Sequence, residues 1–153
     1  MPLLDLHHVA IKSKNLEETV EFYRDVLGME QVERPEFPFP GAWLQMGETM
    51  FHIYGGDPAK THSGNYKYSQ RVSPIDHIAL RATGFDEMKK KLRKHKCEWR
   101  QMNIPDFRLW QLFVLDPSGV VIELNFEVDS EPKDSKGPSG QKKYEFGMFR
   151  AAA

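Results

Sequence analysis

A short pattern that occurs twice is the feature that most constrains how this chain folds. Residues 6–11 (Leu-His-His-Val-Ala-Ile) match residues 75–80 (Ile-Asp-His-Ile-Ala-Leu). In both, the order is an apolar residue, any residue, histidine, a β-branched residue, alanine and an aliphatic residue. The register continues without a gap, since Leu16 and Phe85 lie at the same offset from their histidines. Self-similarity of this kind indicates a duplicated structural unit. We therefore expect two similar half-domains.

Both copies continue with the same series of predicted elements. Apolar residues recur at helical spacing after each repeat, with Asn15 placed to cap the first helix and Gly28 to end it. Three strand-like segments follow each helix. They are residues 29–33, 42–46 and 49–54 in the first copy, and 98–102, 109–115 and 120–126 in the second. The sequence thus predicts an α+β fold made of two βαβββ modules.

Composition sets the expected boundaries of the modules. We expect the first module over residues 5–57, a polar linker over 58–74 and the second module over 75–128. Residues 129–153 include a charged stretch rich in Pro, Gly and Ser, at 131–141, which is typical of a flexible tail.

Charge and hydropathy exclude several classes of protein. The 21 Lys and Arg residues nearly balance the 22 Asp and Glu residues, so no overall field favours nucleic acid or an anionic membrane. Apolar runs do not exceed four residues, whereas a membrane-spanning helix needs about 20. Cys97 is the single cysteine, which excludes an internal disulfide and suits a reducing compartment. With no secretory signal evident in residues 1–5, we expect a cytoplasmic protein.

Strand periodicity predicts where the histidines point. Side chains alternate across a strand, so Val9 and Ile11 face one way while His8 faces the other. The same parity puts His77 opposite Ile78 and Leu80. The branched aliphatic residues are expected beneath the helices, which leaves the histidines on the open face of each sheet.

Four potential metal ligands share this face, one on each of four strands: His8, His52, His77 and Glu123. His52 follows His8 by 44 residues, and Glu123 follows His77 by 46. A lone strand histidine is more often a surface or core residue, but four symmetric positions on one face are not expected by chance. Imidazoles and a carboxylate suit one divalent ion, whether Fe, Mn, Ni, Co or Zn. The remaining histidines, at 7, 62 and 95, lack the required parity or lie on exposed segments.

Three strings of residues resemble a known family. His8-Val9-Ala10-Ile11, then residues 22–29 (FYRDVLGM), then residues 116–123 (DPSGVVIE) are similar to the vicinal oxygen chelate superfamily, which includes glyoxalase I, bleomycin-resistance proteins and extradiol dioxygenases. The resemblance covers about residues 5–127. It implies a cupped sheet with helices outside, modules related by a pseudo-two-fold axis, a divalent metal and a homodimer. His8, His77 and Glu123 match the metal-ligand positions of the family, and His52 matches its fourth, more variable one.

The resemblance implies a metal-dependent lyase or isomerase of glyoxalase type, acting on a small α-hydroxycarbonyl-like substrate. Glu123 would be ligand and base, and His52 a ligand or proton shuttle, although glyoxalase I has a glutamate at that position. An Fe(II) extradiol-type dioxygenase and a small-molecule binding or resistance protein are the alternatives. The expected substrate-binding residues are Lys12, Trp43, Gln45, Tyr54, Arg81, Trp110 and Asn125.

Overall fold

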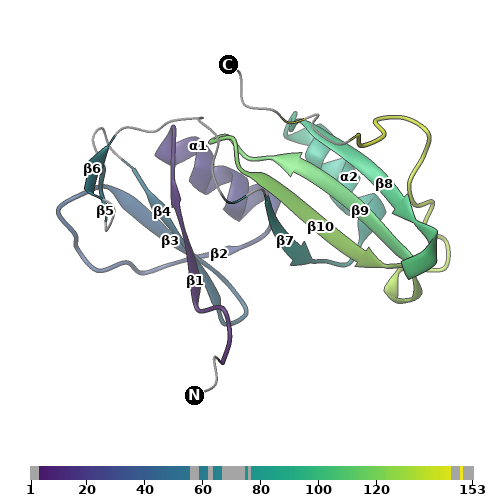
Figure 1. The fold of residues 1–153 in the computed structure, drawn as a ribbon, viewed down its shortest axis with the longest axis horizontal. Helices are drawn as coiled ribbons and strands as arrows, with labels where there is room; N and C mark the ends of the chain where they lie inside the picture. The colour runs from purple at the N-terminus through teal and green to yellow at the C-terminus, as the bar shows by residue number, and fades with distance from the viewer. Residues whose placement is uncertain are drawn as a thin grey trace. The chain divides into compact units, whose positions relative to one another are not determined.

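A computed structural model of the chain describes residues 4–55, 59–61, 64–66, 75, 77–145 and 149 (Figure 1). The chain divides into two compact units, Met1–Gln70 and Arg71–Ala153, called module 1 and module 2 below. Each is described by itself. Among the described residues, no helix has the length and apolar character needed to cross a membrane.

Module 1 has the predicted order of elements. Strand β1 (His8–Lys12) leads into helix α1 (Leu16–Glu21), which continues as a π-helical turn, η1 (Phe22–Val26). Strands β2 (Glu30–Val32), β3 (Gly41–Met46) and β4 (Thr49–Tyr54) follow. They form a sheet in the order β1-β4-β3-β2, in which β1 is parallel to β4 and the other pairs are antiparallel. A short antiparallel hairpin, β5 (Ala59–Thr61) and β6 (Gly64–Tyr66), lies within the segment expected to be a linker.

The core of module 1 follows the predicted alternation. Asn15 caps α1, since its side-chain oxygen accepts from the backbone N–H of Glu18 at 3.0 Å. Tyr23 is fully buried and packs on Phe51 of β4 with 5.4 Å between ring centroids. Ile53 of β4 is also buried, whereas His52, which lies between Phe51 and Ile53 in the strand, is half-buried on the other face.

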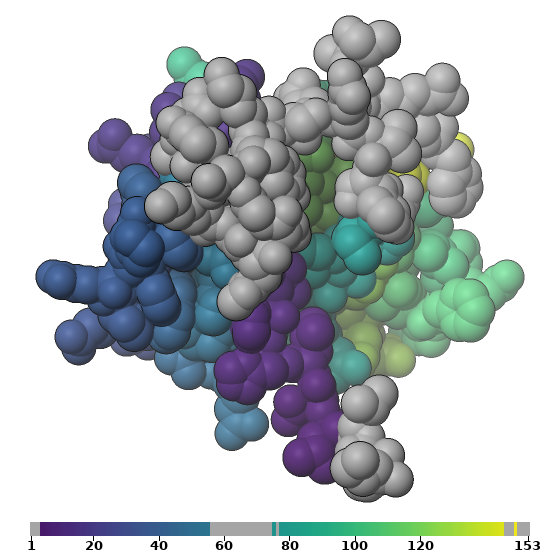
Figure 2. Space-filling view, turned by 60° about the vertical axis from the view of Figure 1, so that its left-hand side comes forward, coloured from purple at the N-terminus to yellow at the C-terminus, as the bar shows by residue number. Residues whose placement is uncertain are grey.

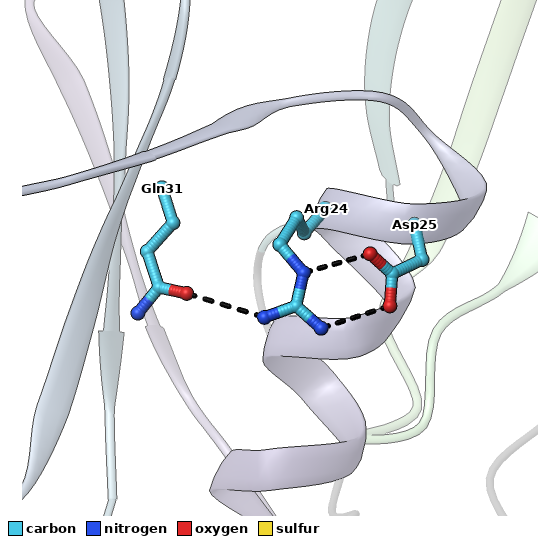
Figure 3. Close-up of polar contacts among 3 residues, drawn as sticks. All are labelled: Arg24, Asp25 and Gln31. Atoms are coloured by element: carbon cyan, nitrogen blue, oxygen red, sulfur yellow. Dashed lines mark hydrogen bonds and ion pairs between the residues drawn. The ribbon is translucent and has the colours of Figure 1, made fainter.

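An exposed arginine joins the end of the helix to β2 (Figure 3). Arg24 donates to both carboxylate oxygens of Asp25, at 2.7 and 2.9 Å, and to the side-chain oxygen of Gln31 at 3.3 Å. Because such surface pairs are hydrated, they contribute little to the free energy of folding.

Module 2 repeats this topology, which confirms the predicted duplication. It contains β7 (His77–Arg81), α2 (Phe85–Lys94), β8 (Trp99–Ile104), the 3-10 turn η2 (Pro105–Phe107), β9 (Leu109–Leu115), β10 (Val121–Glu127) and the 3-10 turn η3 (Val128–Ser130). The sheet order is β7-β10-β9-β8, with β7 parallel to β10. The turn before β10 closes on Asp116, whose Oδ1 accepts from the N–H groups of Ser118 and Val120 at 2.8 and 2.7 Å. The two mixed four-stranded sheets confirm the α+β fold.

The segment after η3 differs from the flexible tail expected from its composition. It lies beside α2 and β8, in yellow in Figure 1, and makes specific contacts with module 2. The backbone N–H of Gln101 on β8 donates to the carbonyl of Lys142, and the Gln101 carbonyl accepts from the N–H of Tyr144. The Tyr144 ring stacks on Phe113 at 3.8 Å between centroids. Composition missed this docking because the segment buries few apolar side chains and is held mainly by hydrogen bonds to the edge of β8.

Glu131 ties this segment to the start of α2. Its two oxygens accept from the N–H groups of Gly84 and Phe85 at 2.9 and 2.7 Å, and the residue is buried. These are N–H groups that a helix N-terminus leaves without intrahelical partners.

We expect Glu131→Gln to lower the free energy of unfolding by about 1–2 kcal/mol, because the amide keeps one acceptor and loses the charge. Chemical denaturation measures the change, and faster hydrogen exchange at the Gly84 and Phe85 amides locates it. Glu127→Gln, on the exposed end of β10, serves as the control. Equal effects of the two substitutions would contradict the role of Glu131 as a cap.

Candidate metal centre

In module 2, His77 and Glu123 form a close pair. They lie on the parallel neighbours β7 and β10, where Glu123 is in register with Ala79, so both side chains emerge from one face. His77 Nε2 lies 3.2 Å from Glu123 Oε2. The carboxylate is mostly buried, with 13% of its side chain exposed, and the imidazole is 39% exposed.

Two amides hold the other oxygen of Glu123. Gln111 Nε2 and Asn125 Nδ2 each donate to Glu123 Oε1 at 2.9 Å. Gln111 also donates to Asn125 Oδ1 at 2.9 Å, so the three side chains form one network. Hydrogen bonds of this type fix the orientation of metal-binding carboxylates. One oxygen of Glu123 is thus held by the protein, and the other faces His77.

Gln111 was missed by the sequence analysis, which selected Trp110 instead. Trp110 is in register with Phe126 on the buried face of the sheet and packs on Phe85 of α2 at 5.3 Å between ring centroids. Gln111 is in register with Asn125 and shares its face. The alternation of side chains along β9 could have identified Gln111, because this position points to the open face of the sheet.

In module 1, His8 and His52 lie in a stack of rings. His8 and His52 stack at 4.2 Å between centroids with an interplanar angle of 15°. Trp43 stacks on the opposite face of His52 at 4.3 Å and 5°. The pairing of β3 with β4 explains this, since Trp43 and His52 are directly in register.

The stack restricts what the two imidazoles can do together. Lone pairs of imidazole lie in the ring plane, and nearly parallel stacked rings have separate planes. His8 and His52 therefore cannot both direct an in-plane lone pair at one ion unless a ring rotates. A hydrogen bond joins His8 Nδ1 to His7 Nδ1 at 2.9 Å, so Nε2 is the nitrogen of His8 suited to a ligand.

The environment of His52 favours its neutral form. Burial lowers the pKa of His52, and electrostatic interaction with His8, His7 and Arg34 lowers it further.

The remaining predicted substrate residues have diverse surroundings. Gln45 Nε2 donates to the carbonyl of Gly47 at 2.9 Å, and Tyr54 makes an edge contact with Phe39. Arg81 is exposed and pairs with Glu127 at 3.7 Å, which places it in water. Burial lowers the pKa of Lys12.

The side chains present suit a divalent cation in their chemistry. Among the described residues, no group of three or more His, Cys, Asp or Glu side chains is arranged so that it could hold a metal ion; each module instead contains a pair of candidate ligands. The donors are imidazole nitrogens and a carboxylate, the set preferred by first-row divalent metals. Metal ligands usually have outer contacts of this kind: the amides of Gln111 and Asn125 are hydrogen-bonded to Glu123, and His7 is hydrogen-bonded to His8.

Comparison with known proteins supports the family resemblance seen in the sequence. Residues 5–124 match the profile of the glyoxalase/bleomycin resistance protein/dioxygenase superfamily. "Glyoxylase I 4" of Arabidopsis thaliana is 28% identical over 127 residues, which cover 80% of this chain and 70% of that protein.

Solved structures of other proteins have the same fold as this chain. A putative glyoxalase family protein from Bacillus anthracis is 25% identical and superposes with a TM-score of 0.64, covering 83% of this chain and 98% of that one. TnmS3, an antibiotic binding protein from Streptomyces sp. CB03234, has the same fold at 18% identity and a TM-score of 0.60, with coverage of 83% and 98%. The family profile spans most of the chain, so the resemblance is confirmed: the chain belongs to the glyoxalase/bleomycin resistance protein/dioxygenase superfamily.

Proposed function

We propose that the protein is a metal-dependent lyase or isomerase of glyoxalase type that acts on a small α-hydroxycarbonyl-like substrate. His8, His77 and Glu123 are the proposed ligands of one divalent cation, as the sequence predicts. The observation that carries this proposal is the Glu123 carboxylate, which has one oxygen held by Gln111 and Asn125 and the other 3.2 Å from His77. A carboxylate oriented in this way is ready to bind a cation.

The side chains have separate roles in the proposed reaction. The cation supplies Lewis-acid stabilisation of charge that develops on the substrate oxygens. Glu123 would accept a proton from the substrate carbon at Oε2 when that oxygen is displaced from the cation, while the hydrogen bonds from Gln111 and Asn125 to Oε1 keep the carboxylate in place. His52, whose pKa is lowered where it lies between Trp43 and His8, would be a further proton acceptor.

An Fe(II) extradiol-type dioxygenase is the second candidate. The stack on His52 favours it, because with His52 held outside the ligand set, His8, His77 and Glu123 would be a two-histidine, one-carboxylate set. Such a set leaves coordination positions for a bidentate substrate and O₂.

A binding or resistance protein is the third candidate. TnmS3, with the same fold, is described as an antibiotic binding protein. The aromatic side chains of Phe37, Phe39 and Trp43 offer a surface for such a ligand.

Metal titration tests the proposal first. We expect calorimetry with Mn²⁺, Fe²⁺, Co²⁺, Ni²⁺ and Zn²⁺ to give about one ion per chain for at least one metal, by analogy with sites of this ligand set. Substrate panels then separate the candidates: turnover of hemithioacetals or α-hydroxyketones supports the lyase or isomerase, and O₂ uptake with catechols supports the dioxygenase. No binding of any metal would overturn both enzymatic proposals and leave the binding protein.

We further propose that the protein is a homodimer, which the family resemblance supports. We also propose that it lies in the cytoplasm, which the single cysteine, Cys97, supports. Light scattering after gel filtration measures the mass in solution, and a monomer would contradict the dimer.

A further inference from the structure

Arg34 lies in the segment that connects β2 to β3, on the side of module 1 that carries His52. Its Nη2 donates to the carbonyl of Phe39 at 3.0 Å. The guanidinium carbon is 4.7 Å from the ring centre of Phe37 and 5.0 Å from that of Phe39. Arg34 is thus held in place by its own segment and, in the part of the chain that the structure describes, not by an acidic side chain.

The guanidinium has an unmet requirement for an acceptor. Arg34 Nε is buried and forms no hydrogen bond with any described residue, and no described carboxylate pairs with the side chain. A buried N–H group without an acceptor is unfavourable, because it loses hydration and gains no hydrogen bond in return. Guanidinium groups typically meet this requirement with a carboxylate, which accepts two parallel N–H bonds.

The backbone is adapted to this arginine. A Cβ built on Gly41 would lie 3.0 Å from both Cζ and Nε of Arg34, and 2.6 Å from the carbonyl oxygen of Ile53. Glycine at this position in β3 thus lets the guanidinium approach the strand closely.

Aromatic rings extend from Arg34 to His52. Phe37 contacts Trp43 at 6.3 Å between centroids, and Trp43 stacks on His52. Phe37 is 44% exposed, so part of its ring is available to a ligand. The segment that carries Arg34 and Phe37 lies at the surface of module 1, in dark blue in Figure 2.

We propose that Arg34 is a substrate-binding residue, which takes the carboxylate of a ligand whose planar, aromatic or conjugated part rests on Phe37 and Trp43. The inference rests on the proposed function and names its substrate class: a small planar carboxylic acid. The phenylalanine rings use the face of the guanidinium and its Nε is buried, so the terminal N–H groups are the part that binds the acid. His52 lies at the other end of the aromatic series, so the acid group would bind away from the proposed reacting centre.

Paired probes test the charge requirement. Protein in buffer passed over a chelating resin, without added metal, is titrated with benzoate and with benzamide, and then with phenylacetate and phenylacetamide. Each pair has the same shape and differs in charge. We expect a saturable shift of the Arg34 Nε–H signal in ¹H–¹⁵N spectra with the acids, and affinity for each acid at least about tenfold above that for its amide.

Two variants separate charge from stacking. Arg34→Gln should reduce the affinity for the acids about tenfold or more and leave the amides unchanged, whereas Phe37→Ala should weaken acid and amide alike. Arg24→Gln, an exposed arginine already paired with Asp25, is the control and should match the wild-type protein.

Equal binding of acid and amide, no saturable binding of any of the four probes, or unchanged acid binding by Arg34→Gln would overturn the inference. Because these titrations contain no metal, their failure beside successful metal binding removes only the inference. Successful titrations beside failed metal binding remove only the enzymatic proposals.

Discussion

Replacing Glu123 by glutamine should lower the affinity for a divalent cation more than about 100-fold, since loss of a metal's outer contacts alone costs 10–100-fold. Glutamine keeps the size of the side chain, and its carbonyl oxygen can still accept from Gln111 and Asn125. What is lost is the negative oxygen facing His77. Calorimetric metal titration measures the change, and circular dichroism checks that the fold is intact.

The same titration discriminates among the histidines. We expect His77→Ala to resemble Glu123→Gln, and His52→Phe, which preserves a stacked ring, to lose less than about tenfold. His95→Ala, at the exposed end of α2, is the control. A Glu123→Gln protein that binds the metal as tightly as the wild-type protein would contradict the proposed ligand set. A loss at His52→Phe equal to that at His77→Ala would show that the ring of His52 leaves its stack to bind the ion.

Replacing Gly41 by alanine should lower the free energy of unfolding by about 3 kcal/mol, the upper part of the usual range for overpacking. The new methyl group would approach the backbone oxygen of Ile53 to 2.6 Å, and a backbone atom in a sheet cannot move aside as a flexible side chain can. Its second neighbour, the guanidinium of Arg34, is held by Phe39. The loss exceeds the gain of about 0.4–1 kcal/mol from a less flexible unfolded chain.

Urea denaturation of the Gly41→Ala protein checks this value. Gly140→Ala is the matched control, because its Cβ would meet no atom within 4 Å. We expect the control to stay within about 0.5 kcal/mol of the wild-type protein, as surface substitutions usually do. A Gly41→Ala protein that is as stable as the control would show that β3 and β4 can separate at Gly41 without cost.

Much of the fold could be predicted from the sequence, since it rests on local, periodic signals. The repeated histidine strand, the helical spacing of apolar residues and the turn at Asp116 each depend on nearby residues only. Strand alternation also assigned His8, His52, His77 and Glu123 to the open faces, opposite the buried residues of the same strands. Periodicity of this kind reports burial, and burial decides which face of a strand meets a helix.

Tertiary structure decided which polar groups are partners. Gln111 on Glu123, Glu131 on the start of α2 and the docked segment near Gln101 all depend on strand register or on contacts far apart in the chain. The stack on His52 and the surroundings of Arg34 depend likewise on the pairing of β3 with β4 and on the segment before β3. Hydrogen bonds and ring contacts are short-ranged and directional, so they form only where the fold sets distance and angle. The repeating pattern of side chains in the sequence thus determined the two modules and the open faces, whereas the residues that orient the candidate ligands emerged only once the strands were in register.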